Sequence, residues 1–128
     1  MTDIDLRHLT RRERDLMRIL DAFHVLAEAD PIDPTVPGSC WVATRNLGGH
    51  ADPAQRRALF PPEQSVPGVP RTSARWLMMK LHGPLGDRLV LHRCGTSACL
   101  RPDHLYVGDQ HANMLDRVRH ARLRRGAA

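Results

Sequence analysis

A segment of thirteen residues, HRCGTSACLRPDH at positions 92–104, gathers side chains that can bind a metal ion or move a proton. Cys94, Cys99 and His104 follow one another with four residues between successive members. Thiolates and imidazoles are the usual ligands of structural zinc, which takes four of them in a tetrahedron. The spacing therefore predicts a zinc site on a tight loop, with one further ligand to be supplied.

Two residues are candidates for the fourth ligand. Cys40 is the only other cysteine in the sequence, and its recruitment would tie the first half of the chain to the cysteine loop. Alternatively, Cys40 is a small buried hydrophobic residue, and His92 completes the site from two positions before Cys94. Residue types and spacing leave both alternatives open.

If His92 is not a zinc ligand, it can act as a base, because the ordinary pKa of histidine lies near physiological pH. It would then stand at the end of a strand, beside the loop, with Asn113 near the start of the next helix. An asparagine carbonyl suits a hard cation such as Mg²⁺, which also binds substrate phosphate. A base and a cation placed on either side of the same phosphate can together hydrolyse nucleic acid.

The elements that must position these residues follow from apolar periodicity and turn residues. Thr10 and Glu13 are spaced as a capping box at the start of the first helix. Residues 46–73 are expected to be mostly loop, and 30–39 a proline-rich linker. The predicted elements are a helix over 10–28, a strand over 40–44, a helix over 73–83, strands over 87–92 and 104–107, and a helix over 110–125.

Composition favours a phosphate-rich partner. The 128 residues contain 19 Lys and Arg against 14 Asp and Glu, and residues 117–126 hold five arginines and no acid. Such a surface attracts nucleic acid by releasing condensed counterions, although a solvated cationic face is the simpler alternative. We expect a helical extension and linker over residues 1–39 and one zinc-stabilised domain over residues 40–128.

Targeting signals are not evident in the sequence. It lacks a run of about 20 apolar residues and an apolar secretory signal at its start, so no membrane partner is expected. Three cysteines, an odd number, fit a disulfide framework poorly. We therefore expect a cytoplasmic protein, in which clustered Cys and His indicate a metal site.

The run VLHRCGTSACLRPDHLYVGDQHANMLD, residues 90–116, resembles the HNH endonucleases with a ββα-metal active site. The likeness is greatest to phage and intron-encoded homing-type members, including the His-Cys box enzymes. Weaker similarity extends to RWLMMKLHGPL and to Cys40-Trp41. The positions shared with the family are His92, Cys94, Cys99, Pro102, His104, Leu105, Gly108 and Asn113.

The resemblance implies an α+β fold, a small ββα-metal (HNH) nuclease core with a structural zinc loop and an added N-terminal helix. It makes His92 the general base and Asn113 the ligand of Mg²⁺ or another divalent cation. Arg75 is the first candidate for an arginine that assists the phosphate, with Arg71 second. The zinc ligands implied are Cys40, Cys94, Cys99 and His104. The chain departs from its relatives at Gly95-Thr96, at Arg101 and in having no cysteine after Cys99.

The expected function is hydrolysis of double-stranded DNA in a bacterial or phage-infected cell. Asn113, Arg117, His120 and Arg124 share one face of the last helix, and we expect the last three to bind DNA. Met114, Leu115, Val118 and Ala121 form an adjoining apolar face. The main alternative is a catalytically inactive zinc-stabilised DNA-binding module, and a protein-binding zinc adaptor is a third. The apolar face of the first helix is a candidate homodimer surface.

Overall fold

The computed structural model describes residues 4–64 and 66–126. It combines helices with antiparallel sheets of two strands each, as expected for the α+β class. In chain order, the helices and strands are α1 (Arg11–His24), β1 (Leu26–Ala29), β2 (Cys40–Ala43), β3 (Leu47–Gly48), β4 (Arg57–Ala58), α2 (Ser73–His82), β5 (Leu89–His92), β6 (Leu105–Gly108) and α3 (Gln110–Arg124). None of the helices in the described ranges is long and apolar enough to cross a membrane.

Helix α1 begins as predicted and ends earlier than predicted. Its capping box is formed by Thr10 and Glu13, each backbone N–H donating to the other side chain at 2.9 and 3.1 Å. The helix stops at Val25, which has a φ of 49°. The Asp21 carboxylate accepts a hydrogen bond from the Leu26 backbone there, at 2.9 Å. The predicted helix over 10–28 was therefore wrong in its last turn, where the chain forms strand β1.

Strand β2 is paired along both edges. On one side it pairs antiparallel with β1, from Leu26 opposite Ala43 to Ala29 opposite Cys40. On the other side it meets the cysteine loop, because Ala43 N–H donates to the Ala98 carbonyl at 3.0 Å and Leu100 N–H donates to the Trp41 carbonyl at 2.8 Å. This pairing places β2 directly beside Cys99. The predicted boundary between residues 39 and 40 lies in the connection from β1 to β2.

The apolar face of α1 packs within the same chain. Leu16, Met17 and Leu20 are between 0 and 7% exposed and share a core with α2, β2 and the end of the cysteine loop. Burying such side chains contributes about 1.5–3 kcal/mol each. Ile19, on the same predicted face, is 44% exposed, so the face is largely but not wholly covered and is a weaker candidate for a dimer surface.

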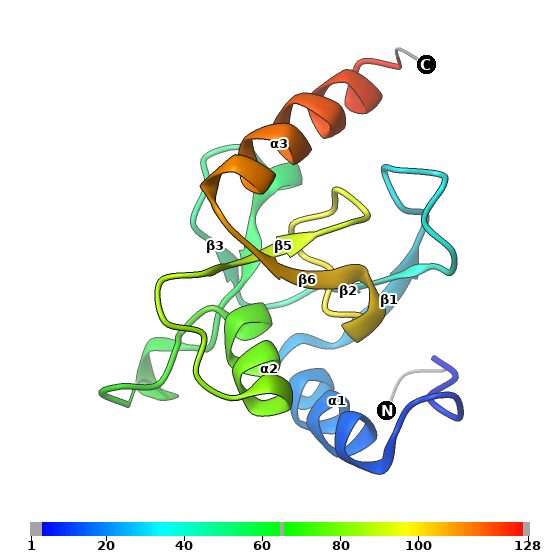
Figure 1. The fold of residues 1–128 in the computed structure, drawn as a ribbon. Helices are drawn as coiled ribbons and strands as arrows, with labels where there is room; N and C mark the ends of the chain where they lie inside the picture. Colours follow the sequence, from blue (N-terminus) through cyan, green and yellow to red (C-terminus); the bar gives the residue numbers. More distant parts are fainter. Residues whose placement is uncertain (1–3, 65, 127–128) are drawn as a thin grey trace.

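The third of the sheets and the last helix form a continuous unit. Strand β5 pairs antiparallel with β6, from Leu89 opposite Gly108 to His92 opposite Leu105, and α3 follows at once. The Asp109 carboxylate caps α3 by accepting from Ala112 N–H at 2.9 Å. Figure 1 shows α3 at the opposite end of the molecule from α1 and α2, with the β5–β6 hairpin between them. A short hairpin, β3–β4, lies within the region predicted to be mostly loop.

Candidate metal centre and its surroundings

Four side chains from three parts of the chain meet in the interior. The ligand atoms of Cys40, Cys94, Cys99 and His104 all lie within 4.8 Å of one another, and each of these residues is 0% exposed. Cys40 opens β2, the next two belong to the loop after β5, and His104 ends the turn before β6. This Cys3His cluster could hold a metal ion such as zinc. His92 is not among the four residues that converge.

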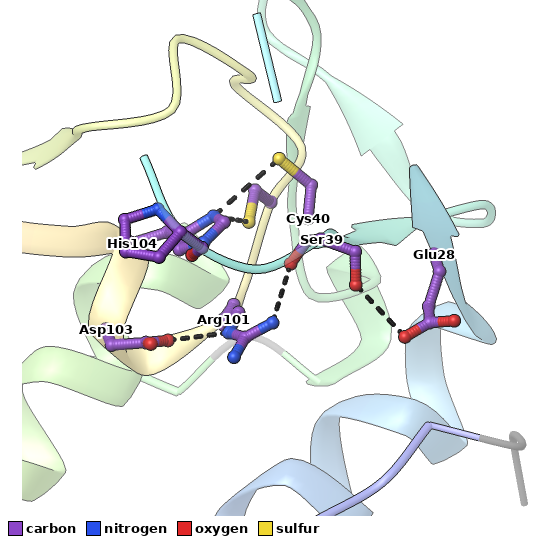
Figure 2. Close-up of polar contacts among 8 residues, drawn as sticks. Glu28, Ser39, Cys40, Arg101, Asp103 and His104 are labelled. Atoms are coloured by element: carbon purple, nitrogen blue, oxygen red, sulfur yellow. Dashed lines mark hydrogen bonds and ion pairs between the residues drawn. The ribbon is translucent and has the colours of Figure 1, made fainter. Parts of the chain in front are cut away.

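The distances within the cluster suit a tetrahedral ion. His104 Nδ1 lies 3.7 Å from the sulfurs of both Cys40 and Cys99, and Figure 2 shows these contacts. Zinc-to-ligand bonds of about 2.3 Å to sulfur and about 2.05 Å to nitrogen put sulfur and nitrogen about 3.6 Å apart. The ligand atoms therefore need little movement to surround such an ion.

The orientation of the His104 ring is fixed by a hydrogen bond from the nitrogen that does not face the sulfurs. Its Nε2 donates a hydrogen bond to the Pro37 carbonyl at 2.9 Å, since a carbonyl can only accept. The proton therefore sits on Nε2, and the lone pair of Nδ1 faces the sulfurs. Metal-binding histidines are commonly held by a second hydrogen bond of this kind.

The three thiols affect one another strongly. Hydrogen bonds from the Cys94 and Cys99 thiols lower the pKa of Cys40. The hydrogen bonds that Cys94 and Cys99 make to Cys40, together with burial and the charge on Cys40, in turn raise the pKa of both thiols. One thiolate is thus favoured and further thiolates are opposed, because like charges in a buried site repel. A divalent cation removes this conflict by neutralising the sulfurs together.

Arg101 holds the residues that precede Cys40 in place. Its guanidinium lies 4.7 Å from the centre of the Trp41 ring and donates to the Ser39 carbonyl at 3.0 Å and to Asp103 at 2.7 Å. Figure 2 shows this arrangement from Asp103 to Ser39. Gly38 has a φ of 84°, which favours glycine, and a Cβ there would lie 2.5 Å from the guanidinium and would displace it. In the sequence analysis Arg101 is a position at which the chain departs from the pattern it resembles, and in the structure Arg101 connects the residues before Cys40 to those before His104.

Asp33 connects the cluster to α3. Its backbone N–H donates to the Cys94 carbonyl at 2.9 Å. Its carboxylate, in a residue that is 4% exposed, accepts a hydrogen bond from Arg119 Nε at 2.9 Å and forms an ion pair with Arg119 Nη2 at 2.8 Å. Although burial acts in the opposite direction, hydrogen bonds from Thr35 and the charge of Arg119 lower the pKa of Asp33 overall.

His92 ends β5 next to the cluster. Its Nε2 donates to the Cys99 carbonyl at 3.1 Å, which leaves the lone pair on Nδ1. The residue is half-buried, and loss of hydration lowers its pKa to about 4. Asn113 lies in the first turns of α3, where its backbone N–H donates to the Asp109 carbonyl at 3.0 Å. Its side-chain amide is half-buried and lies 3.5 Å from the Gln110 amide oxygen.

The Arg75 guanidinium is bound within the fold, whereas that of Arg57 has no partner among the described residues. The Arg75 guanidinium donates to the carbonyls of Arg88 and Gly86, both at 2.7 Å, and so holds the loop before β5. Within the described part of the chain, Arg57 on β4 has no hydrogen-bond or ion-pair partner for its guanidinium. Its positive charge is among the influences that lower the pKa of His92. The sequence analysis missed Arg57, because nothing in a region predicted to be loop placed it near His92.

The predicted DNA-binding residues of α3 have different surroundings. Arg117 is exposed. Arg124 is also exposed, but it donates to the Gly95 carbonyl at 2.8 Å. His120 is 7% exposed, and its Nε2 donates to the Arg93 carbonyl at 3.2 Å. A direct contact of His120 with a phosphate would require it to leave this position, so it is here a packing residue.

Comparison with known protein families, curated proteins and solved structures gave no match to this chain.

Proposed function

We propose that this protein is a metal-dependent DNA endonuclease, in which the Cys3His cluster holds a structural zinc ion and His92 is the general base. The observation that carries the proposal is the position of His92. It stands outside the cluster, at the end of the hairpin that leads into α3, with one ring nitrogen fixed by the Cys99 carbonyl and the other able to accept a proton.

The chemistry of His92 follows from this hydrogen bond. With Nε2 holding a proton, the neutral ring presents Nδ1 as its acceptor. A base positioned by a backbone carbonyl can take the proton of an attacking water without first reorienting. The water oxygen then bonds to phosphorus while the bond to the 3′ oxygen breaks, which leaves a 5′ phosphate and a 3′ oxygen that takes a proton from solvent to become a hydroxyl.

Asn113 and Arg57 would act at the phosphate that is cut, Asn113 through a bound cation and Arg57 by direct contact. The Asn113 carbonyl would hold Mg²⁺ or another divalent cation, which when bound supplies positive charge at the phosphate and the departing oxygen. Arg57 on β4, whose guanidinium has no partner among the described residues, is a better candidate for a phosphate contact than Arg75, whose donors are already used by two carbonyls. The net charge of +5 further favours a nucleic-acid substrate.

The test is nicking of supercoiled plasmid with and without added Mg²⁺ by zinc-loaded protein. We expect His92→Ala to reduce Mg²⁺-dependent nicking by at least about 100-fold, the usual range for loss of a general base. Its zinc content should remain one ion per chain. His82→Ala, at an exposed position on α2, is the matched control and should cut like wild type.

Two results would contradict the proposal. Equal nicking by wild type and His92→Ala would exclude His92 as the base, and loss of zinc in His92→Ala would make it a metal ligand. Duplex binding by wild type that is equally strong with and without Mg²⁺, and that is never followed by nicking, would instead support the DNA-binding module.

A further inference from the structure

Helix α3 presents three large apolar side chains to solvent. Met114, Leu115 and Val118 are 61, 58 and 56% exposed. At about 100° per residue they lie close together on one face of the helix. The opposite side, which carries His120, packs on the cysteine loop. We call these three side chains the apolar stripe. Large apolar side chains that gather on a surface commonly mark a contact site.

The apolar stripe is surrounded by positive charge. By the same helical arithmetic, Arg122 and Arg125 continue its face toward the end of α3, and Arg117 lies at its side. All three arginines are exposed. The one acid in the sequence of α3, Asp116, accepts a hydrogen bond from the Tyr106 hydroxyl. The surface therefore suits a polyanion that also has apolar parts.

A second copy of this chain fits the stripe poorly. A stable protein–protein interface buries about 800 Å² on each partner, far more than three partly exposed side chains can supply. Pairing two such helices would also bring their arginines together. Duplex DNA needs less apolar area, because its phosphates supply most of the affinity.

We propose that the apolar stripe enters a groove of duplex DNA and contacts base edges, while Arg117 and Arg122 bind the phosphates on either side. Apolar side chains in a groove contact thymine methyl groups or separate base steps. The choice of DNA rests on the proposed function. The apolar stripe begins at Met114, the residue after Asn113. A DNA strand held at Asn113 would therefore reach the stripe within about one helical turn, or 5.4 Å along the helix axis.

The test compares binding of a labelled 30-base-pair duplex across salt concentrations, using zinc-loaded protein without Mg²⁺. The triple variant Met114→Gln, Leu115→Gln, Val118→Gln keeps good helix formers in α3. We expect it to bind about tenfold or more weakly at every salt concentration, with an unchanged slope of log affinity against log salt. Arg122→Gln should instead reduce that slope by about 1. The double variant Val66→Gln, Val69→Gln, at loop positions 55 and 41% exposed, is the matched control and should bind normally.

Wild-type affinity in the triple variant would overturn the proposal. So would a wild-type dimer that the triple variant converts to a monomer of equal DNA affinity, because the stripe would then serve self-association. The two proposals can fail separately. If the wild type binds duplex DNA through the apolar stripe but never nicks it, only the nuclease proposal is excluded. If the triple variant binds and nicks like an active wild type, only the proposal for the apolar stripe is excluded. If the wild type has no affinity for duplex DNA, both proposals are excluded.

Discussion

His92 Nε2 donates a hydrogen bond to the backbone carbonyl of Cys99, at 3.1 Å. The candidate base is thereby joined to a residue of the Cys3His cluster, without being part of it. A change in the cluster that moves the Cys99 backbone also moves the imidazole. If the protein cuts DNA as proposed, the cluster need not touch the substrate to affect the reaction, because it helps to hold the His92 ring in place.

Removal of the metal should destabilise the protein and abolish nicking together. Zinc present at 1,000 times its Kd stabilises the folded state by about 4 kcal/mol. We expect a strong chelator to lower the urea midpoint and to alter the near-ultraviolet circular dichroism of Trp41, which follows Cys40. Added zinc should restore both signals and added Mg²⁺ neither. An unchanged urea midpoint after verified metal removal would contradict a structural role.

Arg101→Ala should lower the free energy of unfolding by about 1–2 kcal/mol, because it removes a hydrogen bond to Ser39 and a stack on Trp41. Its side chain is 13% exposed, so water replaces these contacts poorly. Urea unfolding of the zinc-loaded proteins measures the difference. Arg125→Ala, at an exposed position, should change stability by less than about 0.5 kcal/mol. Equal losses in the two variants would mean that Arg101 has no special role.

Asp33 and Arg119 should show a measurable coupling energy. The Arg119 side chain is 57% exposed, so solvent screening keeps the expected coupling energy to about 1 kcal/mol, although Asp33 is buried. A double-mutant cycle with Asp33→Asn and Arg119→Gln, measured by urea unfolding, isolates this term. We also expect each single variant to nick more slowly than wild type at unchanged zinc content, because α3 carries Asn113. Strictly additive effects on stability would exclude the link.

Stability should fall below about pH 6.5 because of His24. Its Nδ1 donates to the Arg45 carbonyl at 2.9 Å, its Nε2 accepts from Ser73 at 2.7 Å, and burial lowers its pKa. The unfolded chain, with an ordinary histidine pKa of about 6.5, therefore takes up the proton first. The contribution of His24 is complete above that pKa and is lost as the pH falls through it toward the folded value.

Urea midpoints from pH 5 to 8 measure this effect. His24→Gln should be less stable at pH 8 and should have a flatter profile than wild type, since one group that opposes protonation is gone. His82→Gln, at an exposed position, is the control for loss of a histidine and should follow the wild-type profile. Parallel profiles for wild type and His24→Gln would contradict the assignment.

The convergence of the cysteines could be anticipated from residue type and spacing, whereas the position of His92 relative to the cluster could not. A loop of Cys-x4-Cys-x4-His can close around one ion with any nearby fourth donor. Cys40 reaches the cluster because β2 pairs with residues 98–100. That pairing is long-range, and no local pattern encodes it. Residue types and spacing therefore left open the choice between Cys40 and His92, and only the resemblance to the HNH endonucleases favoured Cys40 as the ligand.

The other incorrect predictions from the sequence have local causes. Residues 26–29, LAEA, continue the apolar spacing of α1 and contain no strong strand formers, so the turn at Val25 was invisible in the pattern. Helical spacing correctly places Asn113 and His120 on one face, but it does not say that this face turns inward at His120. Arg75 looked free because the carbonyls it binds, at Gly86 and Arg88, belong to a loop of unpredictable shape.

Cys40 and His104 are 64 positions apart in the sequence, and this separation sets an order on the synthesis and folding of the protein. A ribosome adds about 5–20 residues per second, so Cys40 emerges several seconds before its last partner. During that interval β2 lacks the cysteine loop on its second edge, and the Cys40 thiol lacks the other members of the cluster. The N-terminal half can build α1 early, but it cannot complete its own interior until the final third has been translated. Any delay between these events exposes a reactive sulfur and an unpaired strand edge to the nascent chain's surroundings.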